Sequence, residues 1–151
     1  EFRSYKNNRR IRSMSVVNEL INAQGESLEF GNYELGAKTK KDGFEFQGDI
    51  YKIKTFNEIT KLEKNGMFVY ESVPGTAVHG FKADENDVTF VVEGPENASI
   101  TLELEPETEY KVHVDDVYVG KNKTNLGGKM SISVDLEEGR PVKVDVKRAF
   151  D

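Results

Sequence analysis

The sequence predicts an all-β protein that folds as an antiparallel β-sandwich, with extra strands and one short helix at its N-terminal end. Apolar and polar residues alternate with period two over most of the chain after Glu26, which is the pattern of half-buried strands. Turn-forming residues interrupt this alternation at short intervals, as they do in sandwiches and barrels. Each predicted strand keeps one polar face, which is typical of antiparallel sheets with a single buried side.

One helix is predicted, over Ser15–Ala23. Its four apolar residues share one face at helical spacing: Val16, Val17, Leu20 and Ile21. Ser15 is a suitable N-cap, and the pair Gln24-Gly25 would end the helix. A first edge strand over the same residues is the alternative.

The first half of the chain contains five predicted strands. They are built around Leu28–Phe30, Phe44–Phe46, Ile50–Lys54, Ile59–Lys64 and Met67–Ser72. Asn65-Gly66 separates the last two, and both residue types tolerate the positive φ angles of a type I′ turn. These two strands are therefore predicted to form a hairpin.

The second half shows the alternation more clearly. Its predicted strands are Val88–Val92, Ile100–Leu104, Tyr110–Val114, Met130–Leu136 and Val142–Val146. The turns between and before them are predicted at Asp84–Asp87, Gly94–Asn97, Pro106-Glu107, Asn125–Gly128 and Glu137–Pro141. No linker-like stretch separates the two halves.

The length of 151 residues fits one domain. We interpret Glu1–Ser13 as a vector-derived or disordered segment, because it is strongly basic and Met14 looks like a natural start. A native basic arm is the alternative. Residues 14–151 are then expected to form a single sandwich domain, with a possible subdivision near residues 81–88.

Composition excludes several kinds of chemistry. The chain has no Cys, which removes disulfides, thiol nucleophiles and cysteine-ligated metals. Its net charge is −6, and without Glu1–Ser13 it becomes −10. A domain this acidic is expected to repel nucleic acid and anionic membranes. No transmembrane segment or signal peptide is visible after Met14, so the sequence predicts a cytoplasmic protein without membrane insertion.

No cofactor, metal site or catalytic residue is predicted. His79 and His113 could bind a metal only if their strands pair, and His113 lies on the polar face of its strand. The acidic stretches Asp115-Asp116, Glu137-Glu138 and Asp84–Asp87 lack the spacing of a calcium loop.

Aromatic residues of the first half are the candidates for ligand binding, since exposed aromatic side chains stack on sugars and anchor protein partners. We select Tyr51, Phe68 and Tyr70, of which Tyr70 precedes the loop at Val73-Pro74-Gly75. The alternative is that these rings fill the core. Glu45, Asp49 and Glu71 are candidates for the paired carboxylates of a glycan hydrolase.

The stretch Leu104-Glu105-Pro106-Glu107-Thr108-Glu109-Tyr110-Lys111-Val112 resembles the corner before strand F of fibronectin type III and related immunoglobulin-like sandwiches. In that corner a Leu, a turn with Pro, a Thr and a Tyr recur. The resemblance implies that the hydroxyl of Tyr110 binds the backbone of the preceding turn. It extends loosely over Asp87–Ala149.

Three further segments resemble a family of short bacterial proteins often labelled endosialidase: Leu28–Leu35, Lys61–Thr76 and Tyr110–Asp116. This resemblance would span nearly the whole chain from Met14. It implies cleavage of polysialic acid, and it assigns no catalytic residue to this sequence.

The leading hypothesis is a non-enzymatic binding module that recognises a protein or a glycan. It rests on the clear strand pattern without a recognisable catalytic constellation. A glycan-active hydrolase using paired carboxylates is the second hypothesis. The third is a structural protein whose sheet edges pair into a homo-oligomer.

Overall fold

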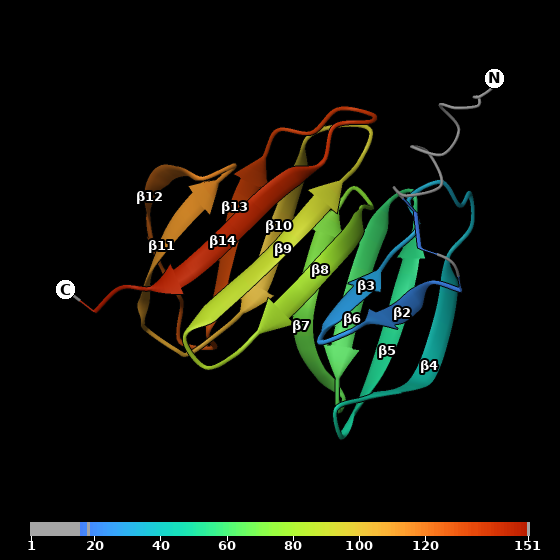
Figure 1. The fold of residues 1–151 in the computed structure, drawn as a ribbon, viewed down its shortest axis with the longest axis horizontal. Coiled ribbons are helices and arrows are strands. Elements are labelled where there is room, and N and C mark those ends of the chain that lie inside the picture. Colours follow the sequence, from blue (N-terminus) through green and yellow to red (C-terminus); the bar gives the residue numbers. More distant parts are fainter. Residues whose placement is uncertain (1–15, 18, 151) are drawn as a thin grey trace.

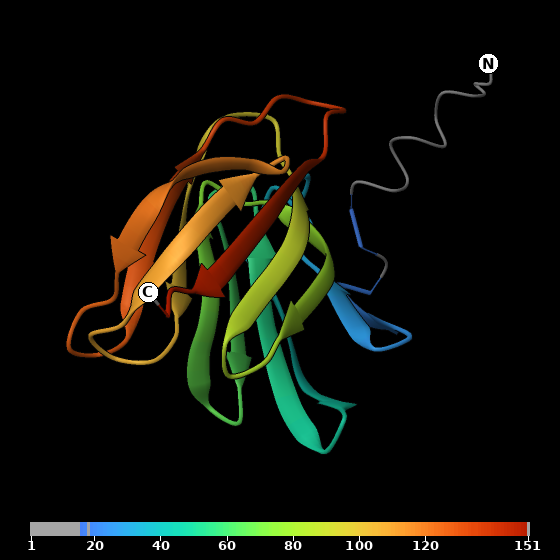
Figure 2. The ribbon, with the colours of Figure 1, turned by 60° about the vertical axis from the view of Figure 1, so that its left-hand side comes forward.

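The computed structural model describes residues 16, 17 and 19–150, and it consists of two sheets packed face to face (Figures 1 and 2). Its strands are β2 (Ile21–Gln24), β3 (Ser27–Phe30), β4 (Thr39–Phe46), β5 (Asp49–Phe56), β6 (Ile59–Lys64), β7 (Met67–Val73), β8 (Ala77–Ala83), β9 (Asp87–Glu93), β10 (Ala98–Glu103), β11 (Glu109–Val114), β12 (Val117–Lys123), β13 (Lys129–Val134) and β14 (Val142–Arg148). The predicted antiparallel β-sandwich is confirmed.

The strands divide into a six-stranded and a seven-stranded sheet. The order is β13-β10-β7-β6-β5-β4 in the first sheet and β12-β11-β14-β9-β8-β3-β2 in the second. Every neighbouring pair is antiparallel. Strands from both halves of the chain therefore meet in each sheet. Among the described residues there is no helix that is long and apolar enough to cross a membrane.

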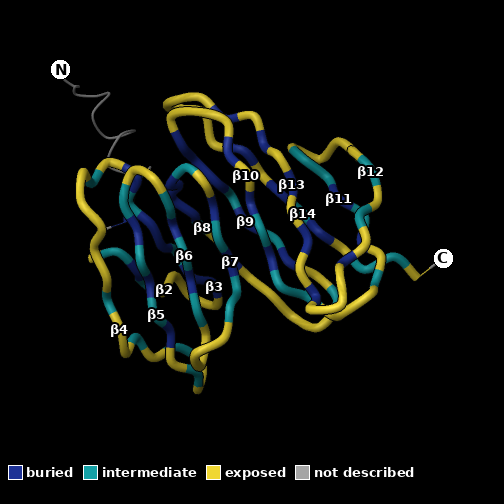
Figure 3. Tube along the Cα trace, turned by 180° about the vertical axis from the view of Figure 1, so that it is seen from behind, coloured by how far each residue is buried: buried dark blue, intermediate teal, exposed yellow. Residues whose placement is uncertain are grey.

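The core lies between the sheets, where the alternating apolar residues face each other. Figure 3 shows the buried stretches along the strands and the exposed ones at the turns. Tyr70 of the six-stranded sheet contacts Phe30 and Phe90 of the other sheet, with ring centroids 5.2 and 5.7 Å apart. Phe81 completes this group of rings. Edge-to-face contacts of this kind add to the apolar burial that holds the sheets together.

The predicted helix over Ser15–Ala23 is absent from the described residues. Ile21–Ala23 belong to β2 and pair with β3, which matches the alternative edge strand. Glu19 and Leu20 have φ angles of 57° and 73°, which a right-handed helix excludes. Pairing with β3 thus outweighs the helical periodicity. Ser15 and Asn18 lie outside the described residues.

The hairpin predicted at Asn65-Gly66 is confirmed. The two residues have φ angles of 52° and 80°, as a type I′ turn requires, and they connect β6 to β7. β2 was predicted only as the alternative to the helix, and β8 and β12 were not predicted. The stretch near residues 81–88, considered as a subdivision, is the hairpin that connects β8 and β9 within one sheet.

The predicted corner contact of Tyr110 is also present. The backbone N–H of Glu105 donates a hydrogen bond of 3.2 Å to the Tyr110 hydroxyl, where the chain crosses from β10 to β11. Tyr110 itself is 1% exposed. The contact confirms the local geometry, while membership of the fibronectin type III family stays a prediction.

The outer strands of the sheets differ in how open they are. β4 carries a register shift, and its Lys41 is opposite the buried Ile53 of β5. A register shift and a charged residue on the inner face both discourage an edge strand from pairing with another chain. β12 exposes Val117, Tyr118 and Val119 at 53–62%. A register shift between β11 and β12 interrupts this edge as well. Pairing of edges into a homo-oligomer therefore stays a prediction.

Candidate functional site

A cleft of about 940 Å³ lies between the two sheets at one end of the sandwich. Its lining includes residues from the turns between β4 and β5, β6 and β7, and β8 and β9, which lie toward the lower edge of Figure 1. A volume of this size falls in the range of sites that bind small molecules or single side chains of a partner. The cleft is the candidate functional site.

The interior of the cleft is apolar and comes from both sheets. Its apolar lining residues are Leu28, Phe46, Tyr51, Met67, Phe68, Val69, Phe81, Ala83, Val88, Leu102, Leu104 and Tyr110. Several of these also belong to the main core, so the cleft continues the core toward solvent. An apolar group that enters it would leave water and contact side chains of both sheets.

The charged lining residues of the cleft are mainly acidic. They comprise six carboxylates, Glu26, Asp84, Glu85, Asp87, Glu103 and Glu105, and two lysines, Lys64 and Lys82. Most of these side chains are exposed, which places them at the rim. The rim therefore favours a ligand that carries positive charge.

Tyr51, one of the residues predicted to bind a ligand, lies in the cleft. It is 8% exposed, and its ring centroid lies 6.3 Å from that of Phe46. Burial, with a smaller effect from the charge of Asp49, raises the pKa of the Tyr51 hydroxyl. The hydroxyl is thus held in its neutral form and can donate a hydrogen bond to a ligand.

Phe68 lies at the margin of the cleft on the outer face of the six-stranded sheet. The Lys129 ammonium lies 4.5 Å from the ring centroid, and that of Lys61 lies 6.0 Å away. Both distances fit cation–π contacts. A lysine therefore already covers the ring that was predicted to stack on a ligand, although Phe68 still contributes to the lining.

Tyr70 lies in the core and not at the predicted surface site. It is 0% exposed, and its hydroxyl is 2.8 Å from the hydroxyl of Thr76. Burial strongly raises the pKa of Tyr70 above its usual range, because the ionised form would have no water around it. The sandwich thus uses Tyr70 for packing, and we leave it out of the candidate site.

The hairpin between β8 and β9 forms part of the acidic rim. The side chain of Asp84 accepts hydrogen bonds of 2.8 Å from the backbone N–H groups of Asn86 and Asp87. These bonds lower the pKa of the Asp84 carboxyl. Asp84 therefore stays ionised at neutral pH, which is the opposite of what a general acid in glycan hydrolysis requires.

Glu45 and Glu71, two of the carboxylates considered for hydrolysis, lie on strands that are not neighbours. Asp49 accepts a hydrogen bond of 2.8 Å from the Asn65 side chain, and it lies 3.7 Å from the Lys64 ammonium. Glu71 lies on β7, opposite Lys61 of β6. Glu45 lies on β4, at the edge of the same sheet. The strand order therefore separates Glu45 from Glu71 by two strands.

The two histidines lie on different strands of the seven-stranded sheet, with β9 and β14 between them. His79 Nδ1 lies 3.0 Å from a carboxylate oxygen of Glu29. Among the residues that the structure describes, no group of three or more His, Asp or Glu side chains could hold a metal ion.

The buried carboxyl of Glu93 interacts electrostatically with His79 and with Glu138. Glu93 is 6% exposed at the end of β9. Burial raises the pKa of the Glu93 carboxyl, the charge of His79 opposes this shift, and that of Glu138 adds to it. Glu138 in turn accepts a hydrogen bond of 3.2 Å from the Tyr33 hydroxyl.

We expect Glu93 to make stability depend on pH. Its raised pKa means that the protonated form is favoured more in the folded protein than in the unfolded chain. The free energy of unfolding should therefore fall as pH rises from the ordinary pKa of a glutamate through the raised pKa of Glu93. Glu93→Gln should remove this part of the fall and raise the melting temperature at neutral pH.

Thermal unfolding at about pH 4 and about pH 7 tests this expectation. Glu96→Gln, at an exposed turn position nearby, is the matched control and should follow the unmodified protein at both values. If Glu93→Gln and the unmodified protein change in parallel with pH, the proposed role of Glu93 is wrong.

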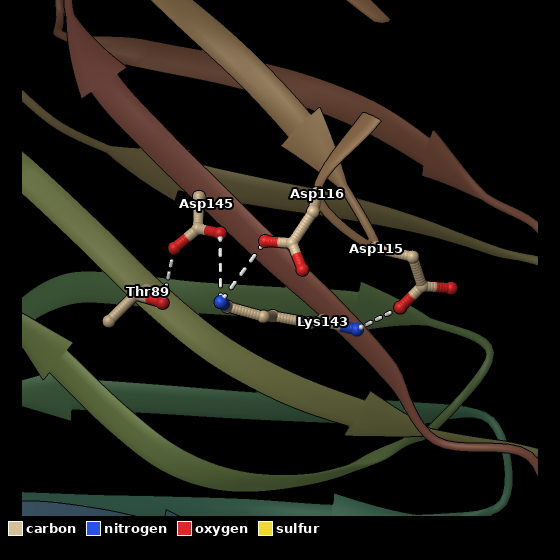
Figure 4. A network of polar contacts seen from close by, with 5 residues as sticks. All are labelled: Thr89, Asp115, Asp116, Lys143 and Asp145. Atoms are coloured by element: carbon tan, nitrogen blue, oxygen red, sulfur yellow. Dashed lines mark hydrogen bonds and ion pairs between the residues drawn. The ribbon is translucent and has the colours of Figure 1, made fainter. Parts of the chain in front are cut away.

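The acidic pair Asp115-Asp116 is engaged in ion pairs (Figure 4). The Lys143 ammonium lies 3.2 Å from Asp116 and 3.8 Å from Asp145. The Lys143 backbone N–H donates a hydrogen bond of 2.9 Å to the Asp115 carboxylate. The hydrogen bond to Asp116, followed by the charges of Asp145 and Asp116, raises the pKa of Lys143. This network ties the β11–β12 turn to β14 and leaves the carboxylates bound to a lysine.

Comparison of the chain with family models, with curated proteins and with solved structures gave no match. Tyr51 and Phe68 were predicted and line the cleft, whereas the apolar residues of the seven-stranded sheet were predicted only as core. Their alternation signals burial and contains no sign that one end of the core stays open.

Proposed function

We propose that the protein is a binding module that accepts an apolar side chain of a partner protein into the cleft between its sheets. The cleft itself carries this proposal, because about 940 Å³ of space is lined by apolar residues from both sheets. Binding there would remove apolar surface from water, which stabilises the complex by about 25 cal/mol for each Å² of apolar surface buried. The hypothesis of a binding module, drawn from the sequence, thereby becomes a proposal about one surface, the cleft.

The rim supports a basic partner segment. Six carboxylates and two lysines line the cleft, so an approaching lysine or arginine meets mainly attractive charges. A sugar has hydroxyls on every side and would need polar partners around it, whereas the polar residues of the cleft lie mainly at its rim and the interior is mostly apolar. A protein segment that combines apolar and basic side chains therefore fits better than a glycan.

The test uses a fluorescein-labelled peptide of alternating lysine and leucine. We expect saturable binding by fluorescence anisotropy, and amide NMR shifts that map to residues lining the cleft. Ala83→Trp should weaken binding by about tenfold or more, which is roughly 1.4 kcal/mol. Ala83 is opposite Val88 across the hairpin, so its side chain shares the face of Val88 and a larger group would fill the cleft.

Ser133→Trp is the matched control, since Ser133 is an exposed strand residue opposite the exposed Ser99, and neither residue lines the cleft. It should bind the peptide like the unmodified protein. Equal loss of binding in both variants would contradict the cleft as the site. Amide shifts in the cleft with maltohexaose, and none with the peptide, would replace the protein partner by a glycan.

A further inference from the structure

A row of three lysines crosses the outer face of the six-stranded sheet. Lys54 on β5 is directly opposite Lys40 on β4 and Lys61 on β6. Residues paired in this way lie side by side on one face, about 5 Å apart. Together with Lys52 and Glu63 these three lysines line a shallow depression of about 50 Å³. We name Lys40, Lys54 and Lys61 the lysine row.

The lysine row places like charges next to each other. Partial burial, followed by the charges of Lys38, Lys61 and Lys40, lowers the pKa of Lys54. An ion pair of 3.6 Å between Lys61 and Glu63 offsets part of the repulsion. Directly opposite like charges weaken a sheet. An anion bound over the row would relieve this repulsion.

Apolar residues border the lysine row on one side. Phe56 and Ile59 are paired two residues away along the same strands, about 7 Å from the row and on the same face. Val73 on β7 is 53% exposed and comes two residues after Glu71, which is opposite Lys61. The face therefore combines a basic row with an adjacent apolar row.

We propose that this face binds an acidic segment of a partner protein, with the segment's carboxylates on the lysine row and its apolar side chains on Phe56, Ile59 and Val73. Charge complementarity and the two parallel rows favour this occupant. A nucleic acid would bring phosphates to the lysine row but no apolar side chains to Phe56, Ile59 and Val73. The surface is separate from the cleft and takes a partner of opposite charge.

A second row of opposed lysines offers a stringent control. Lys111 on β11 is directly opposite Lys121 and Lys147 on the seven-stranded sheet. Carboxylates accompany this row, since Asp87 is opposite Lys147 and Glu109 is opposite Lys123. The lysine row is bordered by carboxylates too, but the second row lacks an adjacent apolar row, because the residues paired two positions away are His113 and Asp145. A simple attraction between lysines and any polyanion would involve both rows equally.

The experiment measures binding of a fluorescein-labelled peptide of alternating glutamate and leucine to the full chain. We expect saturable binding, with amide NMR shifts at the lysine row and the apolar row. Lys40→Gln/Lys54→Gln/Lys61→Gln should weaken binding by about tenfold, as expected for the loss of three exposed charge pairs. Lys111→Gln/Lys121→Gln/Lys147→Gln should stay within about twofold of the unmodified protein.

Both triple variants remove repulsion between like charges and should fold, which thermal unfolding followed by circular dichroism verifies. Equal loss of affinity in the two variants would overturn the proposal, and so would tighter binding of polyuridylate or of phosphatidylserine vesicles than of the peptide. Because the cleft is tested with the lysine–leucine peptide, failure of one proposal is distinguishable from failure of the other.

Discussion

Gly31→Ala is expected to lower the free energy of unfolding by about 2–4 kcal/mol. Gly31 follows β3 with a φ angle of 100°, a conformation that a residue with a Cβ adopts only with strain. An added Cβ would also meet the backbone oxygen of Thr76 at a distance that real Cβ atoms do not show. The backbone segments beside β3 and β8, which are neighbours in the seven-stranded sheet, would have to move apart at this point.

The strain of a positive φ angle is separable from the steric clash. Gly48 has a φ angle of 84°, and nothing lies within 4 Å of a Cβ built on it. Gly48→Ala should therefore cost only about 1 kcal/mol. Urea unfolding of both variants measures the difference, and equal losses would show that the close approach at Thr76 has no energetic weight.

Gly31 also shows why the sequence predicts strands better than their contacts. Its place after Leu28–Phe30 indicates the end of a strand, and β3 does end at Phe30. The approach to Thr76 depends on β3 and β8 being neighbours, and these strands are far apart along the chain. Alternation describes which face of a strand is buried, but it contains no information on which strand lies beside it.

The unpredicted strands lack clear alternation for physical reasons. β12 has Val117, Tyr118 and Val119 in succession, all exposed, because an edge strand with a register shift has no fully buried face. In β8 the register shifts between His79 and Lys82, which breaks the period of two. Both strands are identified by their pairing partners.

Phe68 and Tyr70 illustrate how a bulge changes a site prediction. Two residues apart in one strand, they are expected on the same face. The register between β6 and β7 shifts, so that Tyr70 is opposite the buried Leu62 and Phe68 is opposite Glu63. Tyr70 therefore points into the core and Phe68 points outward. The sequence contains the candidate residues, and the bulge decides which of them reaches the surface.

The acidic composition of the chain gave no indication of the lysine row. A net charge of −6 predicts repulsion of anions by the protein as a whole. The register of β4, β5 and β6 nevertheless brings three separate lysines together on one face. Charge counted over a chain thus does not describe the charge that a bound partner meets.

Thr76→Val is expected to lower the free energy of unfolding by about 2–4 kcal/mol, although valine has almost the same shape as threonine. The Thr76 hydroxyl is 0% exposed and lies 2.8 Å from the Tyr70 hydroxyl and 2.7 Å from that of Ser72. Valine would leave both of these buried groups without this partner. Each unpaired buried polar group costs about 1–3 kcal/mol.

The backbone of Thr76 belongs to the same buried network. Its N–H donates a hydrogen bond of 3.0 Å to the Thr60 hydroxyl, which in turn donates one of 2.9 Å to the Thr76 carbonyl oxygen. The Thr60 hydroxyl also lies 2.8 Å from that of Thr55. The network thus connects β5, β6 and β7 to the start of β8, and it joins the two sheets.

A double-mutant cycle separates the loss of hydrogen bonds from the change of shape. In a Tyr70→Phe background, Thr76→Val leaves one buried hydroxyl fewer without a partner. The loss in free energy of unfolding that it causes should therefore decrease by about 1 kcal/mol. Thr76→Ser keeps the hydroxyl and should lose only about 1 kcal/mol for the missing methyl group. If Thr76→Val costs no more than Thr76→Ser in urea unfolding, the network does not hold the sheets together. The sheets would then be held together by the apolar packing of the core, to which the rings of Phe30, Tyr70 and Phe90 belong.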